Sequence, residues 1–129
     1  MLASILKWLF IIYNKRTLSK EFYNYNLKVD GLKDTVTIYR DKWGVSHIHA
    51  QNNQDLMFAQ GFIHARDRSW QMEMNRRVAM GRISELFGDI ALDTDRLVRT
   101  LGFNQLAKQD YEAASDEVKE CLNCYSDGV

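Results

Sequence analysis

Two pairs of residues in this 129-residue chain have types and spacings that could support metal or redox chemistry. Cys121 and Cys124 are its only cysteines, and their Cys-Leu-Asn-Cys spacing is typical of a redox pair or of half a zinc site. A redox pair usually lies at a helix start after a strand, whereas this pair comes late in an acidic helical pattern. A zinc site needs four ligands, and His47 and His49 would have to complete it. We therefore expect two cysteines one turn apart on a helix, at least one of them buried.

The second pair, His47 and His49, lies two residues apart on a predicted strand. Side chains at that spacing point to the same face of a strand, which could bind a metal. We expect no carboxylate or cysteine within local reach of them. The pattern therefore favours hydrogen bonding at a strand edge or in a polar core.

The charged cluster Arg66-Asp67-Arg68 could be an anion or nucleic-acid site. Acidic and basic residues interleave here, however, and Lys+Arg and Asp+Glu are both 17 in the whole chain. A chain without net charge has no long-range attraction for nucleic acid. We expect these side chains to form ion pairs with neighbouring segments, and we expect no nucleic-acid partner.

The elements that must position these groups begin with short strands. Alternating apolar and polar residues predict three of them, over 25–29, 36–38 and 45–50. Turn signals separate the strands, with Gly31 and Gly44 suited to tight reversals and Asp41 able to cap the second turn. An antiparallel meander of this size is only marginally stable alone.

A long helix is predicted over 52–80, where Asn52 caps the helix and Asp55 places negative charge in its first turn. Gly61 is its one potential interruption before Gly81, and it permits close approach of another backbone.

This helix is apolar on two sides, so it should be sandwiched between layers. One stripe contains Leu56, Ala59, Ile63, Trp70, Met74 and Val78, and a second flank contains Phe58, Phe62, Ala65 and Met72. Glu73 is one turn from Arg76 and Arg77 and should pair with one of them.

Three further segments follow Gly81. A short helical turn over 82–87 is closed by Gly88, and a helix over 89–101 follows. An exposed acidic helix is then predicted over 104–126. The residues expected to face inward are Leu92, Leu97 and Val98 in the first helix, and Leu106, Tyr111, Ala114, Val118 and Leu122 in the second.

The chain divides into an apolar N-terminal extension, 1–21, and an incomplete domain, 22–129. Hydrophobic residues make up 46% and charged residues 26%, which is globular composition. The run Met1–Tyr13 is too short to span a bilayer and is interrupted by Lys7. Three interpretations stay open: a signal-like segment for export, a packed amphipathic helix, and weak membrane association.

Four stretches together resemble the penicillin amidase (penicillin acylase) family, at the start of its α chain. They are YRDKWGVSHIHA, FAQGFIHARDRSWQMEMNRRVAMGRISELFG, ALDTDRLVRTLGF and CYSDGV. The resemblance runs from Leu27 to Val129 and holds its register across many aromatic, charged and glycine positions. Ser46 departs from it, since the family usually has proline after Gly-Val.

The resemblance implies an α+β fold, as the N-terminal fragment of an αββα N-terminal-nucleophile hydrolase. A short antiparallel strand meander would precede a long buried helix and further helices. It also implies hydrolysis of carbon–nitrogen bonds of linear amides, with a link to antibiotic metabolism. In such enzymes the precursor cuts itself, and the freed N-terminal serine is the nucleophile while its α-amino group is the base. Backbone and side-chain donors stabilise the oxyanion.

The family's nucleophilic serine is usually followed by asparagine, with tryptophan further along. The serines of this chain lack that context: Ser4, Ser19, Ser46, Ser69, Ser84, Ser115 and Ser126. The resemblance places the oxyanion donors, the bound calcium and the acyl pocket in segments beyond Val129. We therefore assign no catalytic, cofactor or metal residue to this chain and expect it to be inactive alone.

The expected partners are the remainder of the α chain, the β chain and a small amide substrate of the complete enzyme. One alternative is a structural or interaction module from a truncated gene, binding through its exposed apolar helix. The other is a small redox or metal protein built on Cys121 and Cys124.

Overall fold

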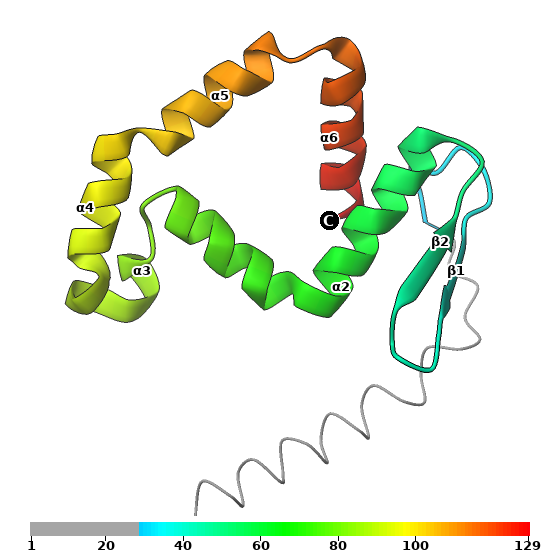
Figure 1. The fold of residues 1–129 in the computed structure, drawn as a ribbon, viewed down its shortest axis with the longest axis horizontal. Coiled ribbons are helices and arrows are strands. Elements are labelled where there is room, and N and C mark those ends of the chain that lie inside the picture. The colour runs from blue at the N-terminus through cyan, green and yellow to red at the C-terminus, as the bar shows by residue number, and fades with distance from the viewer. Residues whose placement is uncertain (1–28) are drawn as a thin grey trace, which may run out of the picture. The chain divides into compact units, whose positions relative to one another are not determined.

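The computed structural model describes residues 29–129, which form an α+β fold in which a hairpin precedes helices, as predicted (Figure 1). The elements are β1 Thr37–Arg40, β2 Ser46–His49, α2 Asn53–Ala79, α3 Ser84–Phe87, η1 Gly88–Ala91, α4 Leu92–Leu101, α5 Phe103–Ala113 and α6 Asp116–Gly128. The segment 1–13 and most of the expected first strand lie outside the described residues. None of the helices within 29–129 combines the length and apolarity needed to span a bilayer.

The described residues belong to two compact units, one containing 38–47 and the other containing 31–37 and 48–129. In the first unit, β1 and β2 pair through the reversal at 41–44. Asp41 Oδ1 accepts hydrogen bonds from the amides of Trp43 at 2.8 Å and Val45 at 3.0 Å. Gly44 has a φ of 82°, which favours glycine. The predicted capped turn is therefore confirmed.

In the second unit, α2 begins at the predicted cap. Asn52 Oδ1 accepts the amide of Asp55 at 2.8 Å, and Asn52 Nδ2 donates to the Asp55 carboxylate at 2.7 Å. That carboxylate also accepts the amides of Lys33 at 2.8 Å and Asp34 at 2.9 Å. Asp55 is only 1% exposed, so these bonds fasten the loop before β1 to the start of α2 while satisfying a buried charge.

The first half of α2 packs on α6 at backbone distance, and Figure 1 shows the two helices side by side. An ideal Cβ on Gly128 would lie 2.0 Å from the carbonyl oxygen of Phe58. His64 Nδ1 and the Tyr125 hydroxyl are 2.9 Å apart across the same contact, and Gln54 donates to Glu120. Small residues thus permit a helix contact that larger side chains would separate.

α2 has a kink at Arg68, where φ is −137° and ψ is 23°. The sequence did not predict this kink, because neither glycine nor proline occurs there. Burial also changes along the helix. Phe58, Ala59 and Ile63 are buried before the kink, whereas Trp70 is 65% and Val78 42% exposed after it. Within the described residues, the expected apolar enclosure is therefore confirmed for the first half of α2 only.

The segment expected to be one helix over 89–101 contains η1 and then α4. A buried Asp95 in the first turns of α4 accepts the amides of Ile83 at 2.9 Å and Ser84 at 2.8 Å, which fixes α3 against α4. Leu92 and Val98 are half-buried, but Leu97 is 60% exposed, so its predicted inward position is wrong.

The helix expected over 104–126 is two helices, because Ala114 is extended and Ser115 caps α6. The residues predicted to form the buried side of this helix are also wrong, because only Ala114 among them is half-buried. The exposed members are Leu106, Tyr111, Val118 and Leu122. The α6 face that meets α2 instead contains Cys121, Cys124, Tyr125 and Gly128.

Candidate functional site

The hairpin places His47 beside a carboxylate. His47 Nε2 is 3.2 Å from Asp41 Oδ2, and the His47 ring stacks on Tyr39 with centroids 4.7 Å apart. The expectation that no carboxylate lies within reach is wrong, because the turn at 41–44 folds Asp41 back onto β2. The expected hydrogen bonding is confirmed for His47. Within residues 29–129, no three His, Cys, Asp or Glu side chains gather as a metal site would require.

Cys121 and Cys124 lie one turn apart on a helix, α6, as predicted. Both are free thiols. We expected at least one of them to be buried, and both are half-buried. Burial raises the pKa of the Cys124 thiol, and the carboxylates of Glu120 and Asp127 raise it further. A raised pKa leaves little thiolate at neutral pH, which is the opposite of a reactive redox cysteine.

Three of the serines have identifiable environments. Ser84 Oγ donates to Asp95 Oδ2 at 2.5 Å, and Ser115 Oγ accepts the amide of Val118 at 3.4 Å. The Ser46 hydroxyl is buried and has no hydrogen-bond partner among the residues that the structure describes. Two of these hydroxyls therefore hold local structure.

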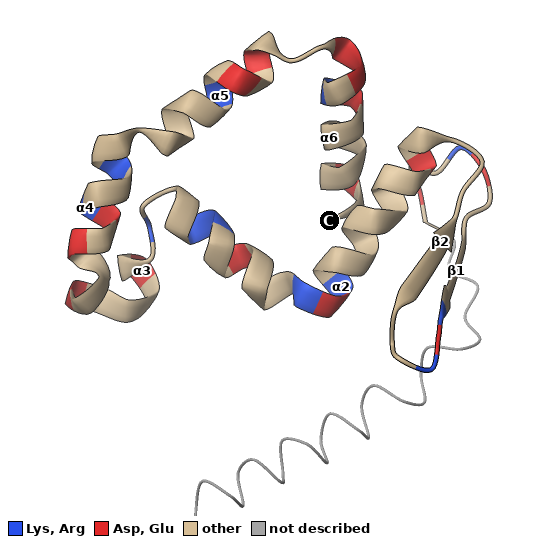
Figure 2. Ribbon diagram, viewed as in Figure 1, with Lys and Arg blue, Asp and Glu red and all other residues tan. Residues whose placement is uncertain are grey.

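The largest charged assembly of the described residues joins the second half of α2 to α3. Glu73 accepts from Arg76 at 2.8 and 2.9 Å and from Arg77 at 2.7 Å, so the predicted pairing is confirmed with both arginines. Arg77 also donates to Glu85 at 2.5 Å, and Arg82 forms a two-pronged contact with the same carboxylate at 2.6 and 3.0 Å. Figure 2 shows the alternating charges along this half of α2.

These contacts shift the protonation equilibria of the carboxylates. Hydrogen bonds and charge from Arg76 and Arg77 lower the pKa of Glu73 from 4.5 to about 2. Arg82 and Arg77 lower the pKa of Glu85 in the same way, and the two glutamates raise the pKa values of Arg76 and Arg82. Both glutamates are therefore ionised at neutral pH, and the assembly ties α2 to the segment after it.

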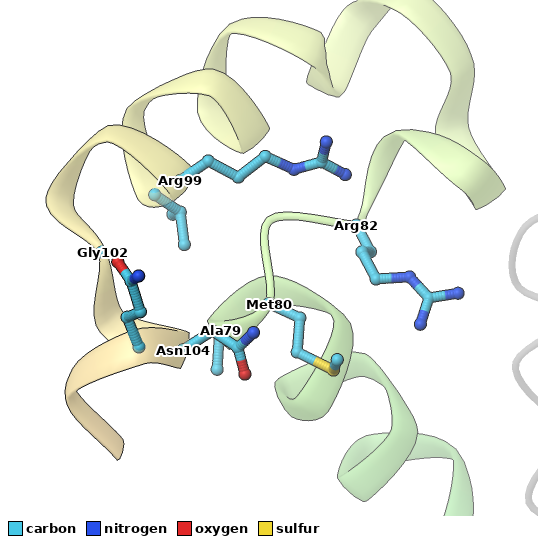
Figure 3. Close-up of a pocket in the computed structure, with 8 residues that line it drawn as sticks. Ala79, Met80, Arg82, Arg99, Gly102 and Asn104 are labelled. Carbon is cyan, nitrogen blue, oxygen red and sulfur yellow. The ribbon is translucent and has the colours of Figure 1, made fainter. Parts of the chain in front are cut away.

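A cavity of about 340 Å³ lies beside this assembly, where α2, α4 and α5 meet (Figure 3). Its lining residues are Ala79, Met80, Arg82, Val98, Arg99, Gly102, Asn104 and Gln105. Arg99 reaches from α4 and donates its Nε to the carbonyl of Gly81 at 2.8 Å. An ideal Cβ on Gly81 would lie 2.7 Å from Arg99 Cγ, so the glycine makes room for this side chain.

The cavity combines an apolar wall, two side-chain amides and two guanidinium groups, a set that can bind a small anion. No local motif predicts this cavity, because its residues come from three segments over positions 79–105. The buried anchor Asp95 was missed for the same reason, since its partners lie 11 and 12 residues away.

Most of this chain is similar to known proteins. Residues 35–129 match the family model described as penicillin amidase. The chain is 43% identical over 104 residues to the penicillin acylase 2 proenzyme of Pseudomonas sp. (strain SE83). The matched region covers 81% of this chain and 13% of that relative. It is 39% identical over 99 residues to the acyl-homoserine lactone acylase QuiP of Pseudomonas syringae pv. syringae. This match covers 77% of this chain and 12% of that relative.

A solved structure agrees with these relatives. The thermostable penicillin G acylase from Alcaligenes faecalis superposes with a TM-score of 0.65 and 28% identity, covering 73% of this chain and 50% of that chain. The chain spans between 12% and 13% of the length of these two curated relatives. The match to the family model over 35–129 shows that the chain belongs to the penicillin amidase family.

Proposed function

We propose that this chain is the N-terminal part of a hydrolase that removes acyl groups from linear amides. The observation that carries the proposal is the family match over 35–129, in a chain that spans about an eighth of the length of its relatives. The names of those relatives give two acylated substrate types, a penicillin and an acyl-homoserine lactone. Both names support the removal of an acyl group from the substrate.

The role proposed for this piece is structural. Its helices present large apolar side chains that the rest of the enzyme, in the α and β chains, would cover. Among them are Trp70 at 65%, Leu97 at 60% and Leu106 at 50% exposed. Covering one such side chain contributes roughly 1.5–3 kcal/mol, so several together give the complete enzyme a strong reason to pack here.

The chemistry would come from a serine freed at the start of the β chain. Its hydroxyl attacks the amide carbonyl while its own α-amino group accepts the proton, and that proton passes to the departing amine. Water then hydrolyses the acyl–serine ester, which releases the carboxylic acid and restores the serine hydroxyl. Preorganised donors would stabilise the oxyanion. In this proposal no residue of 29–129 touches the reacting atoms, and the chain positions those that do through packing.

Expression of the complete reading frame beside the 129-residue chain tests the proposal. We expect the complete product to cut itself before a Ser-Asn sequence and to hydrolyse a chromogenic acyl-amide. The 129-residue chain should release no more product than buffer alone. A complete product in which the new N-terminal serine is replaced by alanine is the control. Amide hydrolysis by the 129-residue chain alone, or an inert complete product, would contradict the proposal.

A second candidate function is an interaction module, which the exposed apolar side chains of α5 and α6 favour. Leu106 at 50%, Val118 at 48% and Leu122 at 49% exposed could bind another protein. Concentration-dependent association, measured by light scattering of the 129-residue chain, would support this candidate. A monomer at all concentrations would argue against it.

A further inference from the structure

Arg99 lines the cavity between α2, α4 and α5, and its guanidinium donors are only partly used. Arg99 Nε donates to the Gly81 carbonyl at 2.8 Å. Among the described residues, its two terminal nitrogens have no hydrogen-bond or ion-pair partner. A guanidinium has five N–H donors in a fixed fork, and its two terminal nitrogens match the two oxygens of a carboxylate.

The Arg99 side chain is also held in position before any ligand arrives. Gly81 is buried with a φ of 61°, and its missing Cβ leaves the space that Arg99 Cγ occupies. The bond to the Gly81 carbonyl then fixes the direction of the guanidinium. A side chain that is already ordered loses less conformational entropy when it binds a ligand.

The carboxylates nearest to the cavity are engaged elsewhere. Glu85 accepts hydrogen bonds from Arg77 and Arg82. Glu73 accepts hydrogen bonds from Arg76 and Arg77. Asp95 is close enough to sense the charge of Arg99, but its oxygens accept the amides of Ile83 and Ser84 and the Ser84 hydroxyl. The described residues therefore leave positive charge at the cavity that an external anion can neutralise.

The rest of the lining restricts the size and character of that anion. Ala79, Met80 and Val98 form an apolar wall, whereas Asn104 and Gln105 add amide donors. A volume of about 340 Å³ lies at the small end of ligand cavities, which span roughly 300–1,000 Å³. A compact molecule with one anionic end and a short apolar body suits this combination.

We propose that this cavity binds a small monocarboxylate, whose oxygens are held by the terminal nitrogens of Arg99 and whose apolar body lies against Met80 and Val98. The inference does not rest on the proposed hydrolase function, since the site uses only residues of this chain. An acidic side chain of another polypeptide is the rival occupant, and the test below distinguishes it.

Titration of the ¹⁵N-labelled chain with hexanoate, followed by NMR, tests the proposal. We expect saturable shifts at the amides of Gly102, Asn104 and Gln105. The alcohol 1-hexanol has the same apolar body without charge and should bind at least tenfold more weakly. Equal binding of the two, or shifts confined to other segments, would overturn the proposal.

Variants of α4 assign the effect to one side chain. Arg99→Gln should weaken hexanoate binding about tenfold or more, because it removes a charge-assisted pair of hydrogen bonds. Arg99→Lys should give an intermediate loss. Arg96→Gln, on the same helix but outside the cavity lining, is the matched control and should bind within twofold of the parent chain. Unchanged binding by a folded Arg99→Gln would refute the proposal.

The product of the complete reading frame gives the last arm of the test. Retained hexanoate binding there supports a small-molecule site. Binding that occurs in the 129-residue chain but is lost in the complete product means that polypeptide fills the cavity, which overturns the proposal. Because this readout is binding, it stays separate from the amide-hydrolysis assay of the proposed function.

Discussion

Gly61 of α2 lies so close to Tyr125 of α6 that an ideal Cβ at position 61 would be 2.1 Å from the Tyr125 carbonyl oxygen. Real Cβ atoms do not approach backbone oxygen so closely, so any larger residue must push the helices apart. The contact also sets which part of α6 meets α2, since Gly128 makes the reciprocal approach to Phe58. Two glycines on facing helices thus set both the distance and the register of this pair.

Replacing Gly61 by alanine should therefore destabilise the chain. Helix propensity alone predicts the opposite, a gain of roughly 0.5–1 kcal/mol for Gly→Ala within a helix. Overpacking should outweigh that gain and lower the free energy of unfolding by about 1–3 kcal/mol. Urea denaturation followed by circular dichroism measures the difference. Asn75→Ala, at an exposed position of α2, is the control and should change stability little. A stabilised Gly61→Ala chain would mean that the helices do not meet here.

Acid should destabilise the chain through its paired carboxylates. Asp55, Asp95, Glu73 and Glu85 all have lowered pKa values in the fold. A lowered pKa means that the unfolded chain binds more protons, so the stabilisation is complete above the ordinary values, 3.8 for aspartate and 4.5 for glutamate. For Glu73 it is lost as the pH falls from 4.5 toward about 2.

Thermal melts between pH 2 and pH 7, taken in steps of about half a pH unit, measure this loss. Glu73→Gln should flatten the profile below pH 4.5, because the group whose pKa is lowered is gone. Asp93→Asn is the matched control, since the Asp93 side chain is 96% exposed and its contact with Arg96 is 3.3 Å long. A Glu73→Gln profile that overlays the parent profile would show that this ion-pair assembly does not stabilise the fold.

The sequence predicted interactions that join residues within about four positions of one another. The Asn52 cap, the Asp41 turn and the pairing of Glu73 with its arginines depend on helix or turn geometry, which spacing determines. The partners of Asp55 lie 21 and 22 residues earlier in the chain, and no local spacing reports such a contact. Hydrophobicity also selected Leu122 as buried, whereas a glycine contact decides the face of α6.

The candidate cavity could not be predicted from the sequence either, because its residues are also far apart along the chain. Arg99 has the sequence context of an ordinary helix residue, and nothing near it indicates that Gly81 lies within 2.8 Å. The kink at Arg68 has no local cause either, because neither glycine nor proline occurs at that point of α2. The family resemblance, by contrast, depends on many positions at once and was confirmed over 35–129.

The two side-chain helix caps within residues 29–129 should differ in strength. Asn52 accepts the Asp55 amide at 2.8 Å and also donates to the buried carboxylate, whereas Ser115 accepts the Val118 amide at 3.4 Å. Asn52→Ala should lower the free energy of unfolding by about 1–2 kcal/mol, near the upper end for a cap. Ser115→Ala is the comparison and should cost about 0.5 kcal/mol. Equal losses in urea denaturation would contradict the additional role of Asn52.

The buried hydroxyl of Ser46, in β2, has no hydrogen-bond partner in the described part of the chain. A buried hydroxyl without a hydrogen bond costs about 1–3 kcal/mol, so removing it should not weaken the fold. We expect Ser46→Ala to raise the free energy of unfolding by about 1 kcal/mol, measured by urea denaturation. Ser84→Ala is the control and should lower the free energy of unfolding, because it removes a hydroxyl that donates to Asp95. A destabilised Ser46→Ala chain would mean that this hydroxyl makes a stabilising hydrogen bond.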